Sequence, residues 1–176
     1  MLASLWTNGA AFGALGTDNR ILTSPDGVHW EAAGSLMREI QGIVGIGFRP
    51  SEGVTYAVVR APAGGGDPGI PEGTAVVLRS TDLATWSVAY QLPWPTWKVT
   101  TADIADEGIV IGGHSDGWFP WMLLSGDGAT WDLSVGWPGN EHGSVDDVAI
   151  GLNGVAAIGG GVAGEGPLAW LHPPVR

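Results

Sequence analysis

The stretch SGDGATW, residues 125–131, indicates the fold because the chain repeats its pattern twice more. The other copies are SPDGVHW at 24–30 and STDLATW at 80–86. Each has Ser, then Asp two residues later, then Trp four residues after the Asp. An Asp side chain can close a turn on its own backbone, Gly adopts a positive φ without strain, and Trp buries a large apolar area. The phrase therefore predicts the same tight turn at three places.

A second, weaker phrase lies ahead of each copy and occurs a fourth time near the end of the sequence. It is Asn or Glu followed by Gly and then a short apolar run, a good signal for a hairpin. The Asp residues of the first phrase are 56 and 45 residues apart, and the turn glycines are 44, 55 and 46 apart. Two marks with similar spacing predict an internal repeat. The turn glycines are Gly9, Gly53, Gly108 and Gly154.

Each repeat reads as four short strands. The first two flank the hairpin Gly, and the third and fourth flank the Asp phrase, as RILTS and WEAA do in the first repeat. No window has a sustained helical period, and the many Gly and Pro residues interrupt helices. Four antiparallel strands in roughly 45 residues are typical of a propeller blade. The sequence thus predicts an all-β fold, a β-propeller of about four four-stranded antiparallel blades.

The Asp phrase resembles the Asp-box, or BNR, repeat of sialidase-type β-propellers, with Leu83 as a departure where Gly is usual. The resemblance implies a turn between the third and fourth strands of each blade. It also implies that Asp and Ser bond the turn backbone while Trp wedges between neighbouring sheets. These residues are therefore expected to be structural and not catalytic: Ser24, Asp26, Trp30, Ser80, Asp82, Trp86, Ser125, Asp127 and Trp131.

We expect one domain over residues 1–176, with blades at about 1–40, 41–97, 98–143 and 144–176. The last blade is incomplete, because LAWLHPPVR at 168–176 supplies a third strand without the Asp phrase or a fourth strand. The strand count is fifteen where four full blades need sixteen. Either the chain forms a small four-bladed ring with a shortened last blade, or it is a homo-oligomer in which two chains contribute to a larger ring.

Loops on the face opposite the Asp phrases are rich in tryptophan and acidic residues. Exposed aromatic faces and nearby carboxylates suit the recognition of sugars or of a protein partner. The alternative is that these aromatic side chains fold back as lids over the ends of the core. The predicted binding residues are Trp94, Trp97, Trp118, Phe119, Trp137, Asp116, Glu141 and His142.

Net charge and composition disfavour several classes of binding partner. The net charge is −11, and only seven Lys and Arg residues are available to neutralise phosphates, which argues against nucleic acid and anionic membranes. There is no cysteine, so neither a disulfide framework nor a thiolate metal site is expected. We expect no cofactor or metal, and neither a signal peptide nor a membrane span. The compartment is left open, with a virion as one option.

We expect no enzymatic activity. A sialidase site would need three arginines on the substrate carboxylate, a tyrosine with its glutamate, and an acidic aspartate, and no such set is evident. A glycosidase with two carboxylates stays open because acidic loops are plentiful, although no pair is singled out. The leading expectation is a non-catalytic interaction or structural protein in a larger assembly, such as a phage tail or surface-decoration protein. The alternatives are a carbohydrate-recognition module and, less favoured, a sialidase-like glycoside hydrolase.

Overall fold

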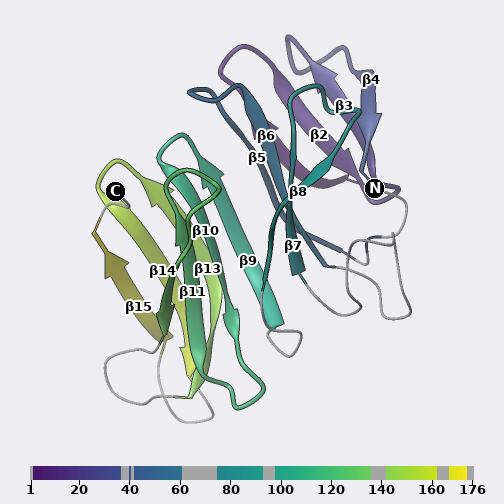
Figure 1. Cartoon of the computed structure of the whole chain (residues 1–176). Coiled ribbons are helices and arrows are strands. Elements are labelled where there is room, and N and C mark those ends of the chain that lie inside the picture. The colour runs from purple at the N-terminus through teal and green to yellow at the C-terminus, as the bar shows by residue number, and fades with distance from the viewer. Residues whose placement is uncertain are drawn as a thin grey trace. The chain divides into compact units, whose positions relative to one another are not determined.

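The computed structural model describes residues 2–36, 40, 42–60, 75–92, 98–135, 142–161 and 167–173. Within these residues the chain forms fifteen strands and no helix, which confirms the predicted all-β class. Accordingly, no helix of the described ranges has the length and apolar character of a membrane span. The strands form four antiparallel sheets in two compact units, Met1–Gln91 and Leu92–Arg176 (Figure 1). That all four sheets form one domain stays a prediction.

The first unit holds two four-stranded sheets, each with its strands paired in chain order. The first sheet consists of β1 (Leu2–Thr7), β2 (Phe12–Gly16), β3 (Arg20–Ser24) and β4 (Glu31–Ser35). The second consists of β5 (Gly42–Arg49), β6 (Val54–Arg60), β7 (Ala75–Ser80) and β8 (Ser87–Gln91).

The second unit holds one four-stranded and one three-stranded sheet, again paired in chain order. The third sheet consists of β9 (Lys98–Ala105), β10 (Gly108–His114), β11 (Pro120–Ser125) and β12 (Asp132–Val135). The fourth consists of β13 (Gly143–Gly151), β14 (Gly154–Gly161) and β15 (Pro167–His172). Within the described residues the fourth sheet therefore has three strands, as the sequence predicts.

In each unit the two sheets pack face to face. Leu15 and Ile21 of the first sheet share one buried cluster with Ala57 and Leu78 of the second sheet, and Trp86 completes it. Successive side chains of a strand point to opposite faces, so only alternate residues enter this core.

The core of the second unit is built in the same way. Val110, Met122 and Leu124 of the third sheet pack with Val155 and Ala157 of the fourth. The same sheet-on-sheet contact is therefore made twice, once in each unit.

The three Asp phrases form the same hydrogen-bonded turn. In the second copy, Asp82 Oδ1 accepts hydrogen bonds from the backbone N–H groups of Ala84 (2.9 Å) and Thr85 (2.7 Å). Ser80 Oγ donates to the same carboxylate oxygen (3.0 Å) and accepts from the N–H of Leu83 (2.9 Å). Asp26 and Asp127 bond their own turns in the same pattern.

One position in each turn adopts the left-handed backbone conformation. It is Gly27 (φ 76°) in the first copy, Gly128 (φ 70°) in the third and Leu83 (φ 63°) in the second. A side chain at positive φ is strained, so the second turn holds Leu83 at a cost that the glycines avoid. The Leu83 side chain packs partly against the core cluster, and this contact offsets some of the cost.

Candidate binding surface

The loop between β10 and β11 presents two neighbouring aromatic residues to solvent. Trp118 is 53% exposed and Phe119 is 46% exposed. The loop is tied by three hydrogen bonds: Ser115 N–H donates to Phe119 O (3.0 Å), Trp118 N–H to Ser115 O (2.9 Å), and Phe119 N–H to Ser115 Oγ (3.3 Å). These bonds fix the loop backbone, and the side chains of Trp118 and Phe119 are exposed to solvent.

Trp118 is fixed by its backbone and by a stacking partner. Its φ is 58°, a conformation that costs a non-glycine residue of order 1–3 kcal/mol and is concentrated at functional sites. Its indole stacks on the buried imidazole of His114, with ring centroids 4.3 Å apart and planes within 3°. His114 Nδ1 lies 3.0 Å from Ser115 O, so this nitrogen carries the proton that the carbonyl accepts. One face of the indole is therefore covered by His114.

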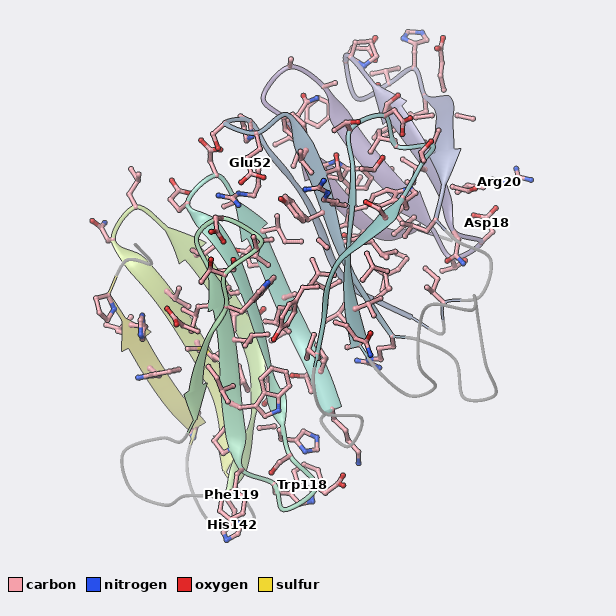
Figure 2. All side chains as sticks on the ribbon, in the orientation of Figure 1. Asp18, Arg20, Glu52, Trp118, Phe119 and His142 are labelled. Atoms are coloured by element: carbon pink, nitrogen blue, oxygen red, sulfur yellow. The ribbon has the colours of Figure 1, made fainter. Side chains whose placement is uncertain are left out.

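The Phe119 ring packs against His142, the residue that precedes β13. The two ring centroids lie 4.7 Å apart, with the ring planes at an angle of 37°. His142 Nδ1 donates to Gly117 O (3.0 Å), and Gly143 N–H donates to Trp118 O (2.6 Å). These bonds join the 115–119 loop to residues about 25 positions further along. Trp118, Phe119 and His142 consequently lie together at one end of the unit (Figure 2), and we call these three residues the aromatic cluster.

The structure describes half of the residues that the sequence predicts for the binding face. Trp118, Phe119 and His142 are brought together, and Asp116 is exposed on the same loop. The other four predicted residues, Trp94, Trp97, Trp137 and Glu141, lie outside the described residues. Sequence reasoning missed His114, because nothing in its spacing indicates that a strand residue supports the Trp118 indole.

The carboxylates of the three Asp phrases accept hydrogen bonds within their own turns. Hydrogen bonds from the backbone N–H of Thr85 and then Ala84 lower the pKa of Asp82 from 3.8 to about 2. The corresponding bonds from Thr130 and Ala129 lower the pKa of Asp127 to about 2. The pKa of Asp26 is also well below its ordinary value, chiefly through the backbone N–H of His29. A carboxylate held ionised in this way is a poor general acid at neutral pH.

The three phrase tryptophans differ in burial. Trp86 is 8% exposed within the core cluster, and its Nε1 donates to Leu83 O (3.2 Å). Trp30 makes the equivalent bond to Gly27 O (3.2 Å) but is 36% exposed. Trp131 is half-buried. The shared phrase therefore fixes the turn more uniformly than it fixes the burial of its Trp.

A second group that sequence reasoning missed lies at the β5–β6 hairpin. Glu52 accepts a hydrogen bond from Tyr56 Oη (2.6 Å) and forms an ion pair with the buried Arg49 (2.6 Å). Burial, and then the bond to Glu52, raises the pKa of Tyr56 to about 12. A nucleophilic tyrosine needs activation in the opposite direction, so this trio fits a structural brace for the hairpin.

A cavity of about 180 Å³ lies at the hairpin end of the first unit. Its lining residues include the aromatic residues Trp6, Phe12 and Phe48 and the polar residues Thr23 and Thr55. The cavity is small for an organic ligand compared with the several hundred Å³ usual for such sites.

Comparison with protein-family models gives no match, and comparison with curated proteins gives no similar sequence. In the described part of the chain, no three His, Asp or Glu side chains lie close enough together to hold a metal ion.

Proposed function

We propose that the chain is a propeller-type module built from Asp-box repeats. Four features support this class: chain-order meander sheets, face-to-face packing of successive sheets, the repeated Ser–Asp turn, and the position of each turn between the third and fourth strand.

We further propose that the module recognises carbohydrate without catalysis, through the aromatic cluster. The observation that carries this proposal is Trp118, an exposed indole held at positive φ and stacked flat on a buried imidazole. A side chain fixed before binding loses little conformational freedom when a ligand arrives. With one face on His114, the opposite face of the indole suits a flat apolar surface such as that of a pyranose ring.

The surroundings of the cluster favour a neutral glycan. Asp116 is exposed on the same loop, and its carboxylate can accept hydrogen bonds from sugar hydroxyls. The chain carries a net charge of −11, which disfavours a sugar that bears a carboxylate or sulfate. The proposed ligand is therefore the neutral end or internal segment of a glycan.

The proposal is tested by applying labelled protein to an array of neutral and anionic glycans. Wild type is expected to bind neutral glycans, and Trp118→Ala to lose about 30-fold in affinity, the effect of a binding residue worth about 2 kcal/mol. Phe12→Ala is the matched control, because Phe12 is as exposed as Phe119 (46%) and belongs to the first unit. Binding that survives Trp118→Ala, or that prefers anionic glycans, contradicts the proposal.

A second candidate is a structural component of a larger assembly, of which a phage tail or surface-decoration protein is one kind. The observation that favours it is the exposure of large apolar residues on the fourth sheet, namely Ile158 (55%) and Leu171 (81%). Apolar side chains presented together on a sheet are commonly covered by a partner.

A further inference from the structure

The fourth sheet is apolar on both faces. Val155 and Ala157 of β14 point into the core of the second unit. Ala156, which lies between them, and Ile158, which follows them, point to the other side and are exposed. Their neighbours across the sheet are apolar as well, since Ala156 pairs with Leu171. A sheet that is apolar on both faces normally has a layer packed on each.

We call this second surface the forward face of the fourth sheet. Along β13–β14–β15 it joins Ala149, Ala156 and Leu171 in one row across the strands, and Asp147, Ile158 and Ala169 in the next. All six side chains are exposed, and five of them are apolar. The surface is therefore mostly apolar, with side chains from three strands and one carboxylate, that of Asp147, on the edge strand β13.

The first sheet also has an apolar face outside its core. Leu15 and Ile21 enter the core, whereas one row across the strands joins Leu5, Ala14, Leu22 and Ala32. Leu5 is 59% exposed at one end of this row and Ala32 is exposed at the other, whereas Leu22 is half-buried and Ala14 is buried between them. We call this row the backward face of the first sheet.

The backward face repeats a surface that is already used inside the chain. In the second sheet, Ala57 pairs with Leu78, and both pack against the first sheet. Leu78 lies two residues before the Ser of its Asp phrase, as Leu22 does in the first sheet. Leu22 in turn pairs with Ala14. The same Ala–Leu pair thus occupies the same position in both sheets.

The forward face of the fourth sheet repeats the surface of the third sheet that packs on the fourth sheet inside the second unit. In the third sheet, Val110 pairs with Leu124, and both pack against the fourth sheet. Val110 lies two residues after the hairpin Gly108, as Ala156 lies two residues after Gly154. Leu171 in the fourth sheet therefore occupies the position of Leu124. The backward face of the first sheet and the forward face of the fourth sheet therefore correspond to the two surfaces that pack together inside each unit.

We propose that the forward face of the fourth sheet in one copy packs on the backward face of the first sheet in a second copy. Both halves are present on this chain, so a second copy supplies the complement to each face. A two-copy ring makes the contact twice and leaves neither face in water, which is the closed outcome of a head-to-tail interface. This inference deepens the assembly candidate by naming its partner, and it is independent of the aromatic cluster.

The test is the solution mass of the whole chain, measured by sedimentation at several concentrations. Wild type is expected to have twice its mass of 18.1 kDa. Leu171→Asp and Leu5→Asp each place a charge on one half of every contact, and each is expected to raise the dissociation constant at least about 100-fold. Leu152→Asp is the matched control: Leu152 is 82% exposed, like Leu171, but lies in the β13–β14 turn away from both faces, so this variant stays dimeric.

Mixing the two monomeric variants distinguishes a head-to-tail contact from any other. The Leu5→Asp copy retains its forward face and the Leu171→Asp copy retains its backward face, so the mixture is expected to regain a dimer through one intact contact. Circular dichroism confirms that each variant is folded, as expected for substitutions at exposed positions. A monomeric wild type, a dimeric Leu171→Asp variant, or a mixture that stays monomeric overturns the proposal. None of these results bears on glycan binding, so the two proposals fail separately.

Discussion

Replacing Trp86 by alanine is expected to destabilise the first unit far more than the same change at Trp30. Both residues close the same seven-residue phrase, and both donate Nε1–H to the carbonyl three residues earlier. They differ in burial, because Trp86 is 8% exposed in the core cluster and Trp30 is 36% exposed. The comparison therefore varies the burial of the Trp side chain while its hydrogen bond to the turn stays the same.

The expected magnitudes follow from the buried area. A Trp side chain buries about 150–250 Å² in a core, and about 25 cal/mol per Å² gives about 4–6 kcal/mol as an upper value. Alanine keeps part of this area and the surroundings relax, so about 3–5 kcal/mol is expected for Trp86→Ala. Trp30 keeps more contact with water, and about 1–2 kcal/mol is expected for Trp30→Ala.

The assay is urea unfolding followed by far-ultraviolet circular dichroism, with the midpoint and the slope fitted separately. A lower midpoint at unchanged slope shows a loss of stability and not a change in the unfolded state. Equal losses for the two variants would refute the reasoning, because they would show that the phrase stabilises through its turn bond and not through the packing of its Trp.

Three further predictions concern the turns and the hairpin brace. The lowered pKa values of Asp82 and Asp127 stabilise the fold at pH values above 3.8, and this contribution is lost as the pH falls towards 2. The thermal midpoint should drop over this range, and it should drop less steeply in Asp82→Asn. Parallel curves for wild type and Asp82→Asn would contradict the role given to the Asp82 carboxylate. Glu52→Gln removes the carboxylate that pairs with the buried Arg49 and should lower the free energy of unfolding in urea by about 2–3 kcal/mol. This is less than for a fully buried pair because Glu52 is partly exposed. A loss under about 0.5 kcal/mol, the size of an ordinary surface substitution, would exclude a structural role for the pair. Gly128→Ala should cost about 1–2 kcal/mol at its φ of 70°, and Gly128→Asn should cost less because Asn tolerates this conformation; equal losses would argue against backbone strain as the cause.

The strands and turns could be predicted because their determinants are local. The Ser and Asp of each phrase bond their own turn, so the spacing within seven residues was enough to place three turns and the strands beside them. Leu83 also could be identified as a departure, and its φ of 63° shows what the missing Gly would have supplied.

The aromatic cluster could be predicted only in part, because it depends on pairing over longer distances. The loop positions of Trp118 and Phe119 followed from the strand order, but their support by His114 and His142 did not. The exposure of the phrase tryptophans could not be predicted from the phrase itself either. Trp30 and Trp86 occupy equivalent positions, and their exposure depends on neighbouring residues that the phrase does not include.

The most direct test of the central claim is where a glycan binds. Protein labelled with 5-fluorotryptophan gives a fluorine resonance for each Trp, and the Trp118→Phe variant identifies that of Trp118. On titration with the neutral glycan that binds most strongly, the account predicts a shift of the Trp118 resonance while that of the buried Trp86 stays in place. A glycan that moves other resonances and leaves Trp118 unchanged, or no shift with any neutral glycan, would contradict it.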